Sequence, residues 1–193
     1  SGRINRGTIS GSDIGKLNYG PGTLDSSTVA AGTVVKPTET GSTLTILKGL
    51  TLNGTLRIGS PPSGSGSVLF STGSQTLAGT GEVKFVTNSA SNTLAPSNSG
   101  SLTIGPGITV HGWFGTIGAV ALGLVNQGTI WADSSVSNLT VTGTSWCNTG
   151  VIQATVASSR IGLAGTLTTP CLGTWHGVVG KVELVGTLDN TAA

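Results

Sequence analysis

Few side chains in this sequence could do chemistry. Besides two histidines, His111 and His176, and two cysteines, there are seven carboxylates: Asp13, Asp25, Glu39, Glu82, Asp133, Glu183 and Asp189. No two of these carboxylates are adjacent or separated by a single residue. Acid–base cleavage of sugars and the binding of Ca²⁺ both need clustered carboxylates. A cluster could assemble only across stacked turns of a repeat, so we expect no enzyme and no catalytic residue.

Motifs for nucleophiles and metals are missing as well. Asp133 is followed by two serines, without a Gly-x-Ser-x-Gly elbow or a nearby base, so residues 133–135 are expected to form a turn. Cys147 has no local histidine partner that would activate a thiolate. No pair of ligands has the spacing of a zinc site. We therefore expect no metal and no other cofactor.

The two cysteines are candidates for a disulfide. The spacing of Cys147 and Cys171 is close to the repeat length described below. A bond between neighbouring turns would favour an oxidising compartment. In the repeat alignment, however, Cys147 is level with Thr169, two positions short of Cys171. The alternative is that both are small, buried apolar residues.

A short phrase recurs three times near the C-terminus. It reads NLTVTGT at 138–144, SRIGLAGT at 159–166 and KVELVGT at 181–187. Its glycines recur at nearly equal spacing, and one apolar column runs through Leu139, Ile161 and Val182. Glu183, which alternates with these apolar positions, should point outward into solvent. Short apolar strands joined by Gly-rich corners at a period of about 20–50 residues are typical of a solenoid.

The composition agrees with this architecture. Charged residues are only 8% of the chain, 32 of 193 residues are glycine, and β-branched and apolar residues alternate. The fold class predicted is all-β: a right-handed parallel β-helix, or β-solenoid, of about 21–22 residues per turn with loop insertions. Residues 1–193 form a single solenoid domain in this interpretation.

Three segments depart from the period. Residues 60–67 (SPPSGSGS) and the Ser- and Asn-rich residues 88–100 are expected to be loops. The spacing between Leu102 and Leu139 is too long for one turn and too short for two. A bulge or side loop at residues 113–118 would absorb the difference.

A second phrase suggests a ladder of outward-facing side chains. It reads GTIW at 128–131, GVIQ at 150–153 and GTWH at 173–176. Because side chains alternate along a strand, Ile130, Ile152 and Trp175 should enter the core. Their neighbours Trp131, Gln153 and His176 should then face outward and are the candidate residues for glycan contact. The alternative for Trp131 is packing under a loop or against a neighbouring module.

Charge and hydropathy exclude two classes of partner. The formal net charge of +2 is spread along the chain without a basic cluster, so we expect no nucleic acid. No stretch of about 18 apolar residues exists, so we expect no membrane span. The N-terminus lacks Met and a signal peptide, which is typical of a fragment. The two ends also resemble each other, as in GTLD at 22–25 and again at 186–189, which suggests one large period of a longer tandem array.

Three segments carry a resemblance to a known group of proteins. Residues 73–81 (GSQTLAGTG), 100–111 (GSLTIGPGITVH) and 124–132 (LVNQGTIWA) resemble the repeats of very large bacterial secreted and surface proteins. Those repeats are of the filamentous-haemagglutinin-like or autotransporter-passenger-like type, and the resemblance covers most of residues 44–190.

The resemblance implies an extracellular or cell-surface protein with a structural or adhesive role. We expect a stalk or filament module that contacts neighbouring copies or repeats end to end, and surface glycans as a further partner. No catalytic residue is carried over. The alternative function is that of a β-helix that binds or cleaves carbohydrate.

Overall fold

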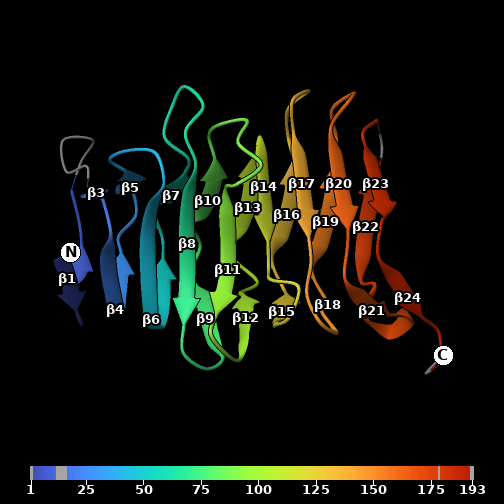
Figure 1. The fold of residues 1–193 in the computed structure, drawn as a ribbon, viewed down its shortest axis with the longest axis horizontal. Coiled ribbons are helices and arrows are strands. Elements are labelled where there is room, and N and C mark those ends of the chain that lie inside the picture. The colour runs from blue at the N-terminus through green and yellow to red at the C-terminus, as the bar shows by residue number, and fades with distance from the viewer. Residues whose placement is uncertain (1, 12–16, 178, 192–193) are drawn as a thin grey trace.

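The chain forms a stack of parallel strands. The computed structural model describes residues 2–11, 17–177 and 179–191, and its regular structure is β-strand apart from one short 3₁₀ turn, η1 (Thr169–Cys171). The strands wind into a β-solenoid of about eight turns, with the first and last strands at opposite ends of the stack (Figure 1). The predicted all-β solenoid with parallel, stacked turns is confirmed.

Each turn places strands on three faces. The first face contains β1 (Gly2–Asn5), β8 (Gly66–Ser71), β11 (Thr93–Ser97), β14 (Phe114–Ile117), β17 (Asn138–Val141), β20 (Arg160–Leu163) and β23 (Lys181–Leu184). The second contains β2 (Thr8–Ile9), β9 (Gln75–Ala78), β12 (Ser101–Ile104), β15 (Gly123–Asn126) and β18 (Cys147–Asn148), and in the last turns β21 (Thr166–Thr168) and β24 (Thr187–Asp189) pair with each other in a separate two-stranded sheet. The third contains β3 (Leu17–Tyr19), β5 (Val34–Pro37), β7 (Thr55–Ile58), β10 (Glu82–Phe85), β13 (Thr109–Gly112), β16 (Thr129–Ala132), β19 (Val151–Ala154) and β22 (Thr174–Gly177).

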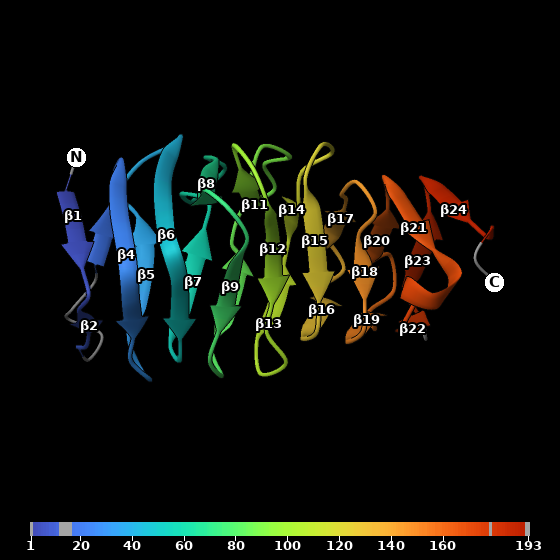
Figure 2. The same cartoon turned by 90° about the horizontal axis from the view of Figure 1, so that it is seen from below.

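Two long strands join the first face to the second. β4 (Gly22–Val29) and β6 (Ser42–Leu52) cross the corner between these faces, so that both belong to one 14-stranded sheet. Ser26 in β4 and Lys48 in β6 adopt positive φ angles, which bends each strand at the corner. Figure 2 shows strands of the second face lying side by side along the stack.

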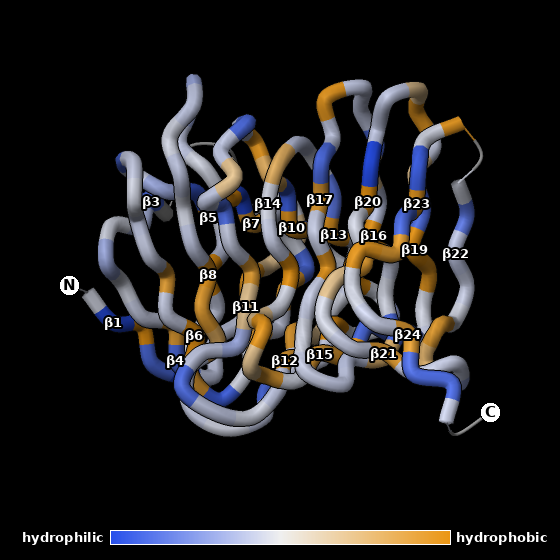
Figure 3. Tube along the Cα trace, turned by 45° about the vertical axis from the view of Figure 1, so that its right-hand side comes forward, coloured by the Kyte–Doolittle hydropathy of each residue, from blue (hydrophilic) through white to orange (hydrophobic). Residues whose placement is uncertain are grey.

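Columns of apolar side chains fill the interior. Leu139 is in register with Ile161, and Ile161 with Val182, as the first phrase predicts. Leu139 and Ile161 are fully buried. The hydropathy view shows the same alignment, with hydrophobic segments recurring along neighbouring strands such as β8 and β11 (Figure 3). One turn cannot bury its apolar side chains alone, so the stacking of turns forms the core.

The second apolar column ends at the surface. Ile130, Ile152 and Trp175 are in register, and the two isoleucines are buried. Trp175, however, is 49% exposed, so the expectation that it lies in the core is wrong. It belongs to β22, the outermost strand of the third face among the described residues, and no further turn covers it there.

The length of a turn varies more than the sequence repeat suggests. In the C-terminal half, Thr129 pairs with Val151, a spacing that agrees with the predicted period. In the middle, Thr55 pairs with Glu82 and Glu82 with Thr109, and both of these turns are longer than the period. The extra residues lie mainly between the first and third faces by way of the second: 17 residues separate Val68 from Phe85, whereas 13 separate their counterparts Val141 and Ala154.

Two of the predicted loops contain strands. Residues 113–118 were expected to form a side loop, but β14 occupies 114–117 and pairs with β11 and β17. Leu102 pairs with Leu124 on the second face, whereas Leu139 lies on the first face, so their spacing measures no turn length. The Ser- and Asn-rich residues 88–100 likewise contain β11.

The third predicted loop is confirmed in its central part. Ser60 and Gly64 form an isolated antiparallel bridge, and residues 61–63 between them are exposed. Gly66 and Ser67 at its C-terminal end already belong to β8. No helix among the described residues is long and apolar enough to cross a membrane.

Candidate functional site

One outward column runs along the third face. Each of its side chains comes from a different turn, because strand side chains alternate and the turns are stacked in register. We call this column the polar strip; it consists of Asn18, Lys36, Arg57, Lys84, His111, Trp131, Gln153 and His176. Neighbours in the strip are therefore a whole turn apart in sequence.

The predicted glycan-contact residues lie in this strip. Trp131 pairs with Gln153, and Gln153 pairs with His176. Trp131 and Gln153 are partly buried, and His176 is exposed on the last strand of the third face. The three side chains are therefore brought together as expected, while glycan contact stays a prediction.

His111 is held between two carboxylates from neighbouring turns. Its Nδ1 lies 2.6 Å from Asp133 Oδ2, and its Nε2 lies 3.1 Å from Glu82 Oε2. Thr55 donates a hydrogen bond of 2.8 Å to the other oxygen of Glu82. Since His111 is only 7% exposed, these contacts satisfy a largely buried ring. We call His111, Glu82 and Asp133 the histidine clamp.

The clamp shifts the pKa values of all three residues. Burial disfavours the charged imidazole, but the hydrogen bonds and negative charges of Asp133 and Glu82 outweigh it and raise the pKa of His111. Burial disfavours the charged carboxylates too. Hydrogen bonds from His111 to both carboxylates, and from Thr55 to Glu82, nevertheless lower the pKa values of Glu82 and Asp133. The clamp therefore favours a charged imidazolium that donates to two carboxylates more than water would.

Trp131 extends from the clamp toward the surface. Its ring stacks on His111 with the centroids 6.2 Å apart and the planes at 28°. Its Nε1 donates a hydrogen bond of 2.8 Å to Thr155 Oγ1. With Asn53 and Thr80, it lines a surface hollow at the corner between the second and third faces. One side of the Trp131 ring thus rests on His111 of the paired strand β13, and packing under a loop or against a neighbouring module stays a prediction.

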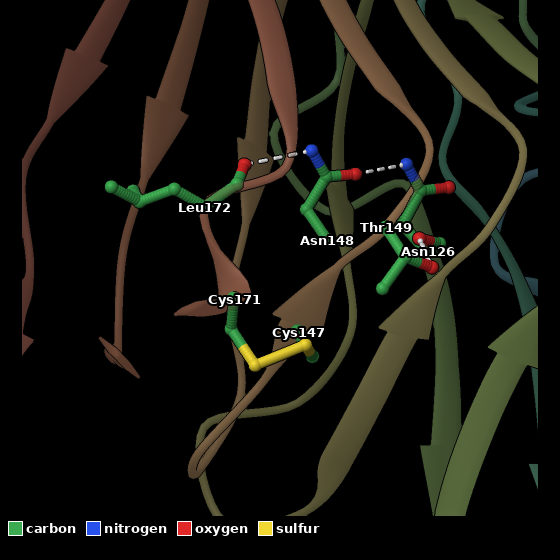
Figure 4. Close-up of a disulfide and its surroundings, with 6 residues drawn as sticks. All are labelled: Asn126, Cys147, Asn148, Thr149, Cys171 and Leu172. Atoms are coloured by element: carbon green, nitrogen blue, oxygen red, sulfur yellow. Dashed lines mark hydrogen bonds between the residues drawn. A yellow bond between two sulfur atoms is a disulfide. The ribbon is translucent and has the colours of Figure 1, made fainter. Parts of the chain in front are cut away.

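A disulfide ties two neighbouring turns together at the second face. Cys147 at the start of β18 is bonded to Cys171 at the end of η1, with Cα atoms 4.5 Å apart (Figure 4). The 3₁₀ turn accounts for the offset between these cysteines in the repeat alignment. No cysteine among the described residues is free.

Buried amides continue the link beside the disulfide. Asn126 Nδ2 donates to Asn148 Oδ1 at 2.7 Å, and Asn148 Nδ2 donates to the carbonyl of Leu172 at 2.9 Å (Figure 4). Asn126 and Asn148 are fully buried. Among the described residues, Oδ1 of Asn126 is the one buried side-chain nitrogen or oxygen atom without a hydrogen-bond partner. This ladder holds three successive turns at one corner.

Neither the histidine clamp nor the grouping of Lys36, Arg57 and Lys84 in the polar strip was predicted from the sequence. Glu82 and Asp133 lie 29 residues before and 22 residues after His111. Predicting the clamp needs the pairings of Glu82 with Thr109 and of Thr109 with Thr129, and the first spacing is longer and the second shorter than the predicted period. Glu183 has a side chain that is 35% exposed, and it also accepts a hydrogen bond of 2.7 Å from Arg160 Nε on the neighbouring turn, which was not predicted.

The described residues offer little for metal chemistry. Among them, no group of three or more His, Cys, Asp and Glu side chains is placed to hold a metal ion. Comparison of the chain with protein-family models, with curated proteins and with solved structures gives no match.

Proposed function

We propose that this chain is a structural and adhesive segment, either a stalk or a filament module, of an extracellular bacterial surface protein, and that it has no catalytic activity. The observation that carries this proposal is the in-register stacking of about eight turns around one continuous apolar core. Such a solenoid gives a defined length and long, regular faces.

Two further features support the extracellular setting. The disulfide between Cys147 and Cys171 is a bond that persists in oxidising compartments. The repeat phrases resemble those of bacterial secreted and surface proteins.

The geometry of the clamp supports the absence of catalysis. Both ring nitrogens of His111 are engaged by carboxylates, so neither is free to take a proton from a substrate. Hydrolysis of a glycoside would need one carboxylic acid with a raised pKa as the proton donor. The pKa values of Glu82 and Asp133 are both lowered instead.

The last turn offers a surface for contact between copies. Trp175, Val179, Leu184 and Val185 are each about half exposed or more, and in the described chain β22, β23 and β24 pair on one side only. Unpaired parallel edges and exposed apolar side chains favour the addition of further strands. End-to-end stacking of copies or repeats would cover both.

Light scattering and electron microscopy over a concentration series test this contact. We expect rods that lengthen with concentration for a filament module, and shorter rods for Val185→Glu. Val136→Glu is the matched control, since Val136 is 48% and Val185 52% exposed, but Val136 lies in the loop before β17. A monomer at every concentration would exclude the filament form and leave the stalk form.

The alternative is a β-helix that binds or cleaves carbohydrate, and the grouping of Trp131, Gln153 and His176 favours its binding form. A glycan array with the wild-type chain and Trp131→Ala separates the two functions. Binding that depends on Trp131 supports recognition of a sugar by the strip. Release of new reducing ends from any bound polysaccharide would contradict the proposal that the chain is not an enzyme.

A further inference from the structure

Stacking gathers three cations that are far apart in the sequence. Arg57 and Lys84 are direct register partners, and Lys36 follows Val35, whose partner Leu56 precedes Arg57. The three side chains thus occupy the same outward column on three successive turns. Adjacent strands are about 4.8 Å apart, so the column presents a positive charge at each such step.

None of these three cations forms an ion pair with a described residue, although Lys84 faces Glu82 and Asp133 at longer range. Elsewhere Arg3 and Lys48 approach Asp25, and Arg160 pairs with Glu183. Among the described residues, no carboxylate oxygen lies within 4.0 Å of the side-chain nitrogens of Lys36, Arg57 or Lys84. Like charges opposite each other on neighbouring strands destabilise a sheet, so an anionic ligand would relieve a cost that the fold carries.

The same strip changes character beyond the cations. His111, Trp131 and Gln153 follow Lys84 on the next three turns. An aromatic ring and an amide suit the apolar face and the hydroxyl groups of a sugar. A linear ligand along the axis of the solenoid would therefore meet charges first and a stacking surface next.

Two carboxylates beside the strip restrict the class of ligand. Glu82 lies two residues before Lys84 on the same side of β10, and Asp133 follows β16 at the edge of the third face. A nucleic acid strand carries a phosphate about every 3.4 Å and would place charges against both carboxylates. A polymer with fewer charges and many hydroxyl groups can leave neutral units there, and the carboxylates can accept hydrogen bonds from them.

The geometry points to an acidic polysaccharide as the ligand of the polar strip. Its carboxylates or sulfates lie against Lys36, Arg57 and Lys84, and a neutral sugar unit lies against Trp131 and Gln153. This inference rests on the adhesive part of the proposed function and names the class of surface polymer that the chain adheres to.

Isothermal titration with a short polygalacturonate tests this assignment, with dextran as the neutral polymer and oligothymidylate as the densely charged one. We expect wild-type chain to bind polygalacturonate, and to bind it more weakly as salt is added. Replacing Lys36, Arg57 and Lys84 by Gln should weaken binding by about tenfold or more, since it removes three ion pairs with the ligand. Trp131→Ala should also weaken it.

A second triple variant controls for net charge. It replaces Arg6, Lys48 and Lys181, which are exposed and lie outside the strip, by Gln and should bind as the wild type does. Equal losses in the two triple variants, or no binding by the wild type, would overturn the assignment. Tighter binding of oligothymidylate would overturn the class of ligand. Rod formation and the absence of hydrolysis are measured separately, so a failure here is distinguishable from a failure of the structural role.

Discussion

At the residue scale, polar side chains act as links between turns. His111 joins the turns that carry Glu82 and Asp133, and Asn148 joins the corners of three turns. Gln75 does the same on the second face, where its Oε1 accepts from the amide of Gly49 at 2.8 Å. Each link places a buried polar group against a partner about one turn away, so the group does not carry the cost of a lost hydrogen bond.

The clamp predicts how stability depends on pH. The stability from a histidine with a raised pKa is fully present below its unfolded value of about 6.5 and is lost as the pH rises through the folded value. The stability from Glu82 and Asp133, whose pKa values are lowered, is present above their unfolded values of about 4 and is lost as the pH falls through the folded values. The clamp should therefore stabilise most between about pH 4.5 and 6.5.

Urea unfolding at about pH 5.5 and about pH 9 measures this effect. We expect the wild type to be less stable at the higher pH by on the order of 1 kcal/mol, and His111→Gln to lose most of that difference. Lys84 also faces both carboxylates, and both variants of this test retain it. His176→Gln is the control, since His176 is exposed; the same change of profile in both variants would contradict the clamp as its source.

Which individual polar residues become buried could not be predicted from the sequence. Asn88 and Asn92 lie in one Ser- and Asn-rich segment, and nothing local distinguishes them. Asn92 is fully buried, and its amide donates to Thr87 and to the carbonyl of Phe114, whereas Asn88 is exposed. The difference depends on β14, a strand on the next turn, whose position is known only once the turn length is known.

At the element scale, short strands with one or two inward side chains could be predicted where the first phrase repeats, at residues 138–144, 159–166 and 181–187. β17, β20 and β23 follow it and were placed in register from the sequence alone. β14 was missed because Gly115 occupies the position that pairs with Leu139. The ring of Phe85, which lies in β10 on the third face, fills the space that a side chain at position 115 would take. The apolar residue expected at this position of β14 is therefore missing from its sequence.

The close packing of Phe85 against Gly115 predicts the effect of adding a methyl group at position 115. A Cβ added at Gly115 would overlap the fully buried ring of Phe85, and φ at Gly115 is not positive, so the effect is steric. We expect Gly115→Ala to destabilise the fold by about 1–3 kcal/mol in thermal or urea unfolding. Adding Phe85→Leu should recover part of the loss.

The matched control is Gly162→Ala on the same face. Its added Cβ would meet Val185, which is 52% exposed and free to shift, so the change should be small. Equal destabilisation by the two substitutions would contradict the packing explanation.

The disulfide should stabilise the C-terminal turns. It links positions with a sequence separation of 24, and for loops of this size the loss of chain entropy in the unfolded state is worth about 3 kcal/mol. We expect the variant with both Cys147→Ala and Cys171→Ala to unfold at lower urea, by about 2–4 kcal/mol in free energy. Reductant should lower the stability of the wild type and leave the variant unchanged; a response of the variant would point to another cause.

At the scale of the whole molecule, the architecture follows from repetition, whereas the surface does not. The recurrence of Gly143, Gly165 and Gly186 is enough to predict stacked turns, because the same residues must meet their own counterparts. The polar strip needs the length of every turn, and the pairs Thr55–Glu82 and Glu82–Thr109 are spaced more widely than the period predicts. An alignment with a fixed period therefore does not pair Lys84 with Arg57, and the column of cations cannot be predicted from it.

A stack of turns also predicts where the molecule opens first. Each inner turn is stabilised by two neighbours, but the outermost ones by a single neighbour, so stability should fall toward the ends. β13 and β16 each pair on both sides, whereas β22 pairs on one side and all four of its residues are exposed.

In dilute solution, amide hydrogens of β22 and β23 should exchange with deuterium well before those of β13 and β16, as measured by mass spectrometry of peptides covering these strands. Raising the protein concentration should slow exchange in β22 and β23 alone if copies stack end to end. Equal exchange along the whole chain would mean that the solenoid opens as one cooperative unit, and that the exposed side chains of the last turn mark no weaker end.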